Sequence, residues 1–158
     1  MVGAGLKGEQ DILARVSIVN FYGNVLLDTF VYPSERITDW RTKYSGIRST
    51  DVLTDEGKNH FLPILIPAKS FEEAQSQVMK LIKDRILIGH ALKGDLAVLK
   101  LSHPYHAIRD TSSYEPFRRK YNSGRPASLE KIVKGELGVT IQSGEHDSVW
   151  HFHRVSLI

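Results

Sequence analysis

The chain contains no cysteine among its 158 residues. Disulfides, thiolate nucleophiles and cysteine-ligated zinc are therefore excluded for these residues. Long apolar runs are also missing, because the longest, FLPILIP at 61–67, is too short to span a membrane and contains two prolines. The first residues, MVGAGLKGEQD, lack the apolar core of a signal peptide. We therefore expect neither secretion nor a membrane partner.

The composition is that of a globular domain. Hydrophobic residues make up 41% of the chain and charged residues 25%, which suffices for a sizeable core. No internal repeat or low-complexity linker interrupts the sequence, so we expect a single domain over residues 1–158. The formal net charge is +3, which permits a phosphate-bearing partner without requiring one.

The sharpest basic cluster is FRRKYNSGR at 117–125, which places two aromatic rings among cations. Cations contact phosphates and rings stack on bases, so this composition suits a nucleic-acid strand. The alternative is an ordinary solvated loop, and composition alone favours the loop. The candidate RNA-binding residues are Arg118, Arg119, Lys120 and Arg125.

Residue patterning predicts an α/β domain. Residues 12–31 form a strand hairpin around a two-residue Gly23-Asn24 turn, since both flanks are rich in β-branched and aromatic residues. A helix follows over 70–84, with Ser70 and Glu73 as a capping box. The remaining predicted elements are a buried strand at 85–90, a helix at 94–102, a strand at 107–112 and a helix at 128–138. This order indicates a mixed sheet flanked by helices, with functional groups at the carboxyl ends of its strands.

Asp95 is the first candidate site residue. It follows the strand that ends in Gly89-His90 and begins the next helix, where the sheet opens into a cleft. One interpretation is a helix cap, a common role that stabilises by about 1 kcal/mol. The other is a ligand or catalytic carboxylate, and the local pattern favours the cap.

Five segments of the sequence, taken together, favour the ligand interpretation of Asp95 over the cap. They are LARVSIVNFYGNVLLDTFVYP, WRTKYSGI, ILIGHALKGDLAVL, IRDTSSYEPFR and PASLEKIV…LGVTIQSGEHDSV, in this order over roughly residues 2–149. The set closely resembles the RNA exonuclease 4 type of the DEDDh exonuclease superfamily. The resemblance implies a ribonuclease H-like fold and 3′→5′ exonuclease activity on single-stranded RNA. It also implies ribosomal RNA processing, with pre-rRNA as substrate, in the nucleus and nucleolus.

The chemistry of that family implies two Mg²⁺ or Mn²⁺ ions, held by four carboxylates on either side of the scissile phosphate. By position, Asp95 matches one metal-binding aspartate, and His146 in GEHDSV matches the general base that activates water. Asp110 lies in a recurrent family segment but is not one of the four carboxylates. We expect it to have a structural or supporting role.

The sequence departs from the family pattern in three places. Before MVGAG the family has a strand ending in Asp-x-Glu, which supplies two metal ligands and forms the centre of the sheet. After the histidine motif, His151 stands where the last aspartate ligand and a helix are expected. An internal stretch at 54–67 matches nothing in the family. We therefore expect an incomplete exonuclease domain, lacking its first central strand and C-terminal helix, as from an incomplete or mis-spliced gene model or a degenerate isoform.

With one of four carboxylates, this polypeptide is expected to be inactive or nearly so. Two alternatives stay open: a non-catalytic RNA-binding or scaffold module, and an unstable fragment without a function of its own. The C-terminal histidines do not favour a metal site. His146 and His151 are five residues apart and His151 and His153 two apart, and neither spacing is the helical i, i+4.

Overall fold

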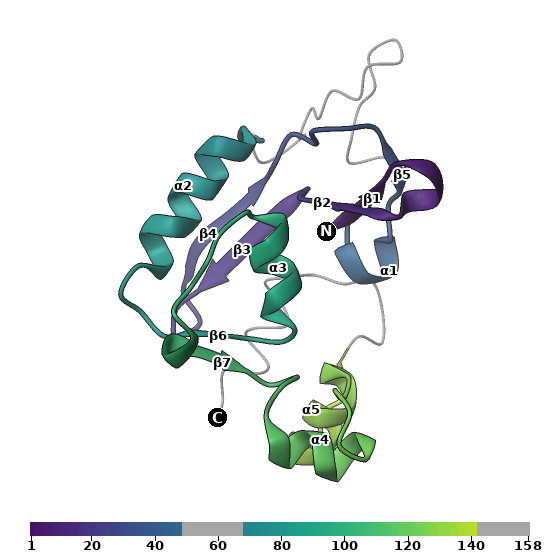
Figure 1. The fold of residues 1–158 in the computed structure, drawn as a ribbon, viewed down its shortest axis with the longest axis vertical. Coiled ribbons are helices and arrows are strands. Elements are labelled where there is room, and N and C mark those ends of the chain that lie inside the picture. Colours follow the sequence, from purple (N-terminus) through teal and green to yellow (C-terminus); the bar gives the residue numbers. More distant parts are fainter. Residues whose placement is uncertain (49–67, 142–158) are drawn as a thin grey trace. The chain divides into compact units, whose positions relative to one another are not determined.

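The computed structural model describes residues 1–48 and 68–141 (Figure 1). These divide into two compact units, the first ending at Leu81 and the second beginning at Ile82. The first contains β1 (Val2–Ala4), a 3₁₀ turn (Leu6–Gly8), β2 (Gln10–Ile12), β3 (Arg15–Val19), β4 (Val25–Phe30), β5 (Ile37–Asp39), α1 (Thr42–Ser45) and α2 (Phe71–Ile82). The second contains β6 (Leu87–Gly89), α3 (Leu92–Val98), a 3₁₀ turn (Tyr105–Ala107), β7 (Ile108–Asp110), α4 (Glu115–Asn122) and α5 (Leu129–Leu137). Whether residues 1–158 form one exonuclease domain stays a prediction.

The first unit contains a small antiparallel sheet in the order β2-β1-β5. Its backbone passes close to the following 3₁₀ turn, because a Cβ on Gly3 would lie 2.6 Å from the carbonyl oxygen of Gly8. Only glycine fits there without a backbone shift. Under this sheet lies a core of six buried apolar side chains: Val2, Ala4, Ile12, Ala14, Ile37 and Ile47.

The predicted hairpin is confirmed as the antiparallel pair β3–β4. Its connection is longer than the expected two residues, because Asn20 closes a loop that runs to Asn24. The Asn20 side chain accepts the backbone N–H groups of Tyr22 and Asn24, at 3.0 and 2.9 Å. Across the strands, Arg15 donates two hydrogen bonds to Asp28 at 2.8 and 2.7 Å. This half-buried pair fixes the register of the hairpin.

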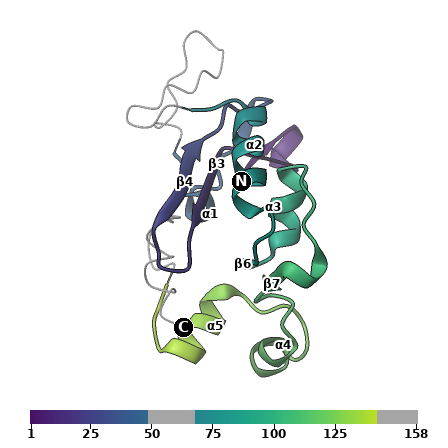
Figure 2. The same cartoon turned by 90° about the vertical axis from the view of Figure 1, so that its left-hand side faces the viewer.

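Helix α2 confirms the predicted capping box. Ser70 Oγ accepts the N–H of Glu73 at 3.1 Å, and Glu73 Oε2 accepts the N–H of Ser70 at 3.0 Å. The helix buries one face that includes Ala74, Val78 and Ile82, and it lies alongside the β3–β4 pair in Figures 1 and 2. The two-residue periodicity of the hairpin and the helical periodicity of α2 thus bury complementary apolar faces.

The second unit is organised around the parallel pair β6–β7, with Leu87 opposite Ile108 and Gly89 opposite Asp110. Strand β6 matches the strand predicted at 85–90 in position but not in burial, since Ile86 and Ile88 are each 61% exposed. The reason is that β6 has a single partner strand among the described residues. Helix α3 begins at Leu92, two residues earlier than predicted.

The second unit ends in two helices. Helix α5 confirms its prediction, with Ser128 Oγ accepting the N–H of Lys131 and Gly138 ending the helix in the left-handed conformation. Helix α4 covers most of the basic segment at 117–125, for which a solvated loop was one of the two interpretations. Pro116 in its first turn is a start signal that the periodicity argument did not use, because the segment is too polar to show an apolar stripe.

The described strands form three separate sheets, and β3–β4 shares no strand with β6–β7 in this part of the chain. Helices and strands together make the structure mixed α/β. Among the described residues, no helix has the length and apolarity needed to cross a bilayer.

Candidate functional site

The candidate site lies at the carboxyl ends of β6 and β7, the edge at which parallel α/β sheets place functional groups. We call it the β6–β7 edge and define it by His90, Asp95, Asp110 and Thr111. Asp110 ends β7, and Thr111 donates its backbone N–H to Gly89 O at 2.9 Å. This hydrogen bond holds the two strand ends together beside the start of α3.

The Asp110 carboxylate is fully engaged with the backbone. It accepts the N–H groups of Ala91, Leu92 and Ser112, each at 2.9 Å. Burial by itself raises the pKa of Asp110, but the hydrogen bonds to the charged form outweigh burial and hold its pKa below the usual value. Asp110 therefore caps the start of α3 from another strand, which confirms its structural role.

Asp95 lies in the first turn of α3 but does not cap the helix, so the cap interpretation is wrong. Asp110 satisfies the N-terminal N–H groups in its place. Desolvation by the surrounding protein is the largest cause that raises the pKa of Asp95, and the nearby charge of Asp110 raises it further. Asp95 keeps much of its surface exposed even so. An exposed carboxylate at the carboxyl end of a strand is suited to bind a cation.

His90 follows β6 directly and was not singled out as a site residue from the sequence. Its Nδ1 lies 2.9 Å from Thr111 Oγ1, while that hydroxyl donates to Gly89 O at 3.2 Å. Thr111 Oγ1 thus links the His90 ring to the end of β6. Burial lowers the pKa of His90, which favours the neutral ring. Thr111, distant in sequence, is the partner that the local pattern did not reveal.

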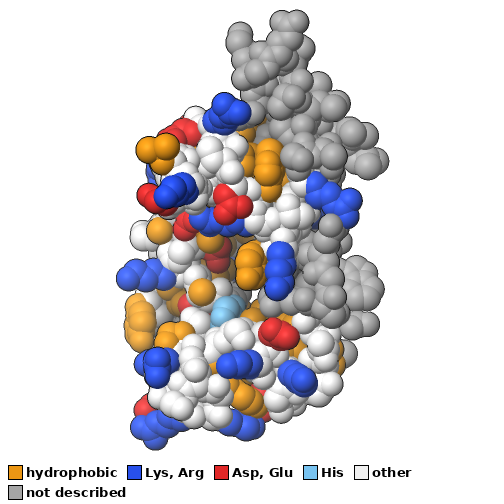
Figure 3. All heavy atoms as spheres, turned by 90° about the vertical axis from the view of Figure 1, so that its right-hand side faces the viewer, with side chains coloured by type: hydrophobic (Ala, Val, Ile, Leu, Met, Phe, Trp, Pro, Cys, Tyr) orange, Lys and Arg blue, Asp and Glu red, His pale blue; other side chains and the backbone are white. Residues whose placement is uncertain are grey.

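The four predicted RNA-binding cations lie in and after α4, and three of them have protein partners. Arg118 Nε donates to Gly124 O at 2.8 Å, Arg119 pairs with Glu115, and Lys120 pairs with Glu136 at 3.1 Å. Only Arg125 has no side-chain partner among the described residues. Figure 3 agrees, because in its lower part the Lys and Arg side chains are spread among other side chains and form no continuous patch. RNA binding by this set stays a prediction.

The predicted general base and the position of the predicted last metal ligand are not among the described residues. His146 and His151 lie outside the described residues, as does the internal stretch at 54–67, so their predicted roles stay predictions. Within the described residues, no three His, Asp or Glu side chains meet in an arrangement that could hold a metal ion. The described residues therefore do not by themselves fit the two-metal site that the family resemblance implies.

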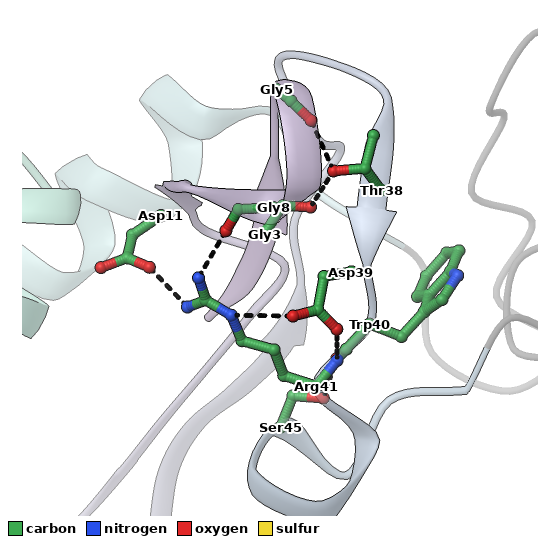
Figure 4. Close-up of polar contacts among 9 residues, drawn as sticks. All are labelled: Gly3, Gly5, Gly8, Asp11, Thr38, Asp39, Trp40, Arg41 and Ser45. Carbon is green, nitrogen blue, oxygen red and sulfur yellow. Dashed lines mark hydrogen bonds and ion pairs between the residues drawn. The ribbon is translucent and has the colours of Figure 1, made fainter.

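Arg41, in the WRTKYSGI segment, organises a second polar cluster in the first unit (Figure 4). Its guanidinium hydrogen-bonds the Asp11 carboxylate and Gly8 O, and its Nε lies 3.6 Å from Asp39. The hydrogen bond to Asp11 and the charges of both aspartates raise the pKa of Arg41. A shallow depression lined by residues 38–44 surrounds it. In this arrangement Arg41 joins β2, β5 and the 3₁₀ turn.

Comparison with known proteins identifies relatives across nearly the whole chain. RNA exonuclease 4 of Candida glabrata is 49% identical over 148 residues, which is 94% of this chain and 51% of that protein. The Saccharomyces cerevisiae and Xenopus tropicalis proteins of the same name are 45% and 46% identical over 94% of this chain, covering 47% and 33% of their own lengths. The chain thus spans about half or less of these relatives. No family model matches it.

Among solved structures, the Saccharomyces cerevisiae Pan2 pseudoubiquitin hydrolase–RNA exonuclease module in complex with AAGGAA RNA aligns with a TM-score of 0.75 and 26% identity. The alignment covers 96% of this chain and 24% of that one. The Neurospora crassa Pan2 catalytic unit aligns with a TM-score of 0.70 and 27% identity, covering 90% of this chain and 24% of that chain. The fold is therefore that of a ribonuclease H-like exonuclease domain, as predicted. Within that class, the chain is similar in sequence to the proteins named RNA exonuclease 4, which confirms the resemblance carried by its five motifs.

Proposed function

We propose that the chain is the core of a 3′→5′ exoribonuclease of the RNA exonuclease 4 type, acting on the ends of single-stranded RNA. The observation that carries this proposal is the 49% identity over 94% of the chain. Asp95 adds support, because it presents an exposed carboxylate with a raised pKa after the carboxyl end of β6. The Pan2 modules with RNA are structural neighbours from the same fold class.

Two Mg²⁺ or Mn²⁺ ions are proposed for the complete site, and in this chain Asp95 would be one of their ligands. Bound ions of this kind supply an activated water and stabilise the leaving oxygen. Asp110 does not replace a missing ligand, since its oxygens already accept three backbone N–H groups. We therefore propose that the 158-residue polypeptide, taken alone, cleaves RNA very slowly or not at all. His146 keeps its proposed role as general base.

The physiological setting is proposed from the resemblance alone: pre-rRNA as substrate, and the nucleus and nucleolus as location. A second candidate function, a non-catalytic RNA-binding module, is favoured by the lack of a complete metal-binding group among the described residues. It predicts RNA binding that persists in EDTA and weakens with salt. The two candidates share a ligand and differ in whether the bound RNA is shortened.

The test compares two purified proteins on 5′-labelled single-stranded RNA with Mn²⁺. One is the 158-residue chain, and the other carries an added Asp-x-Glu strand before residue 1 together with His151→Asp in a family-like helix. Stepwise shortening by the second protein only, abolished by Asp95→Asn, is the expected result. Shortening by the 158-residue chain that survives Asp95→Asn would contradict the proposed role of Asp95. Binding without shortening by either protein would favour the second candidate.

A further inference from the structure

Cationic side chains gather at the amino ends of β6 and β7, the opposite end of the strand pair from the β6–β7 edge. The turn after α2 supplies Lys83 and Arg85, and the connection after α3 together with β7 supplies the others. We call this set the amino-end surface, and it comprises Lys83, Arg85, Lys100, His103, Tyr105, His106 and Arg109. Every member of this set is exposed except His103, which is partly buried.

Hydrogen bonds bring the two connections together. His103 Nε2 lies 2.9 Å from Arg85 O, so its N–H donates across 18 residues of sequence to the segment that enters β6. The parallel register begins with Leu87 opposite Ile108, so the segments that enter β6 and β7 approach the same end of the strand pair. Arg109 NH1 donates to His106 O at 2.8 Å and to Ile108 O at 2.9 Å. The surface is thus fixed by the backbone before any ligand binds.

Three cations of this surface are not neutralised within the described residues. Lys83, Arg85 and Arg109 make no ion pair with a described carboxylate, and the hydrogen bonds of the Arg109 guanidinium go to carbonyl oxygens. Asp84 is the one acidic residue in the two connections. The cations of α4 differ, because carboxylates already pair with Arg119 and Lys120. Uncompensated charges that are held close together favour a polyanionic ligand.

Tyr105 adds a feature that a purely ionic surface lacks. Its side chain is 93% exposed, the highest value among the large apolar and aromatic residues of the described chain. The 3₁₀ turn that carries it is closed by the N–H of Ala107 bonding to Pro104 O at 2.9 Å. An exposed ring carried on a hydrogen-bonded turn between cationic segments offers a stacking platform for an unpaired base.

We infer that the amino-end surface binds the backbone of single-stranded RNA, with Tyr105 stacking on a base, at a site separate from the β6–β7 edge. The inference rests on the proposed function for the identity of the polyanion as RNA. An acidic protein segment would satisfy the cations but would gain little from Tyr105. The surface thus holds the body of an RNA away from the end that is processed.

The test measures binding of a labelled 20-nucleotide single-stranded RNA to the 158-residue chain in EDTA over a range of salt concentrations. Lys83→Ala with Arg85→Ala removes two phosphate contacts, so the slope of log K against log salt should become shallower by about 1.4. Tyr105→Ala should weaken binding by about fivefold or more with an unchanged slope. The matched control is Lys131→Ala with Lys134→Ala, which removes the same charge from the exposed face of α5 in the same unit. The control variant should keep nearly the wild-type slope, because its lost charges affect the RNA only through long-range attraction.

Each outcome decides the inference. Equal slopes for the two double variants, or unchanged affinity for Tyr105→Ala, overturn it. Competition by polyglutamate equal to that by RNA assigns the surface to acidic chains and also overturns it. If circular dichroism shows that the Lys83→Ala, Arg85→Ala variant does not fold, Lys83→Gln with Arg85→Gln provides the same measurement. Because EDTA prevents cleavage, the absence of Mn²⁺-dependent shortening by the protein with the added Asp-x-Glu strand and His151→Asp would refute the proposed function while leaving this binding result intact.

Discussion

Asp110 accepts the backbone N–H of Leu92 at 2.9 Å and thereby attaches the end of β7 to the first residue of α3. The helix that carries Asp95 is therefore positioned by a carboxylate that lies 15 residues further along the chain. The pKa values of the two aspartates shift in opposite directions, because Asp110 is hydrogen-bonded in its charged form whereas desolvation dominates at Asp95. Asp110 stabilises the β6–β7 edge. Ionised Asp95 lowers the stability of that edge but remains exposed to a ligand.

Replacing Asp110 with alanine should lower the free energy of unfolding at pH 7 by about 1–3 kcal/mol, since three N–H groups lose a charged acceptor. A folded-state pKa below the ordinary value means that this stabilisation is present above about pH 4 and is lost as the pH falls through the folded-state pKa. Urea unfolding at pH 7 and pH 3 measures both effects. Glu130→Ala, at an exposed position on α5, is the control and should change stability by less than about 0.5 kcal/mol. A loss of equal size at both pH values would contradict the electrostatic explanation.

Asp95→Asn should have the opposite effect. A raised pKa means that ionised Asp95 opposes folding above about pH 4, increasingly as the pH rises through its folded-state value. In EDTA at pH 7 the variant should equal or exceed the wild type, by no more than about 1 kcal/mol because solvent screens the exposed side chain. At pH 3 the two proteins should unfold at the same urea concentration. Destabilisation by Asp95→Asn at pH 7 would instead show that Asp95 has a structural role.

Arg41→Lys should destabilise the chain by about 1–2 kcal/mol, although the charge is retained. Lysine cannot reproduce the fork that contacts Asp11 and Gly8 O at once. Arg36→Lys is the matched control, because Arg36 is exposed and has no side-chain partner among the described residues. Thermal unfolding of both variants, and of each combined with Asp11→Asn, measures the coupling. If the losses of stability from Arg41→Lys and Asp11→Asn were additive, the proposed coupling between Arg41 and Asp11 would be refuted.

Gly135→Ala should destabilise α5 by about 1–3 kcal/mol, against the ordinary preference of helices for alanine. A Cβ at Gly135 would lie 2.6 Å from Cζ of Tyr121, whose hydroxyl donates to Glu136 Oε1 at 2.8 Å. In a Tyr121→Ala background the space is vacated, so the same substitution should become stabilising by up to about 1 kcal/mol. Chemical unfolding of the four proteins in this cycle gives the coupling. A cost that persists without Tyr121 would place its origin elsewhere.

Several elements could be predicted because their signals are local. The capping box of Ser70 and Glu73 lies within one helical turn, and Ser128 and Gly138 bound α5 through their own backbone neighbours. Helix α4 was missed because its polar residues form no apolar stripe. Asp95 could be singled out as a site residue from its motif, but its environment could not.

The sequence by itself determined the class of fold, the RNA exonuclease 4-like motifs and the helices whose ends are marked by adjacent residues. Those features depend on propensity and on contacts a few residues apart. Only the tertiary structure decided that Asp110 rather than Asp95 caps α3, that Thr111 orients His90, and that most α4 cations are paired within the protein. Each of these depends on which distant segments become neighbours, and a side chain's partners and solvation are fixed only when the chain has folded.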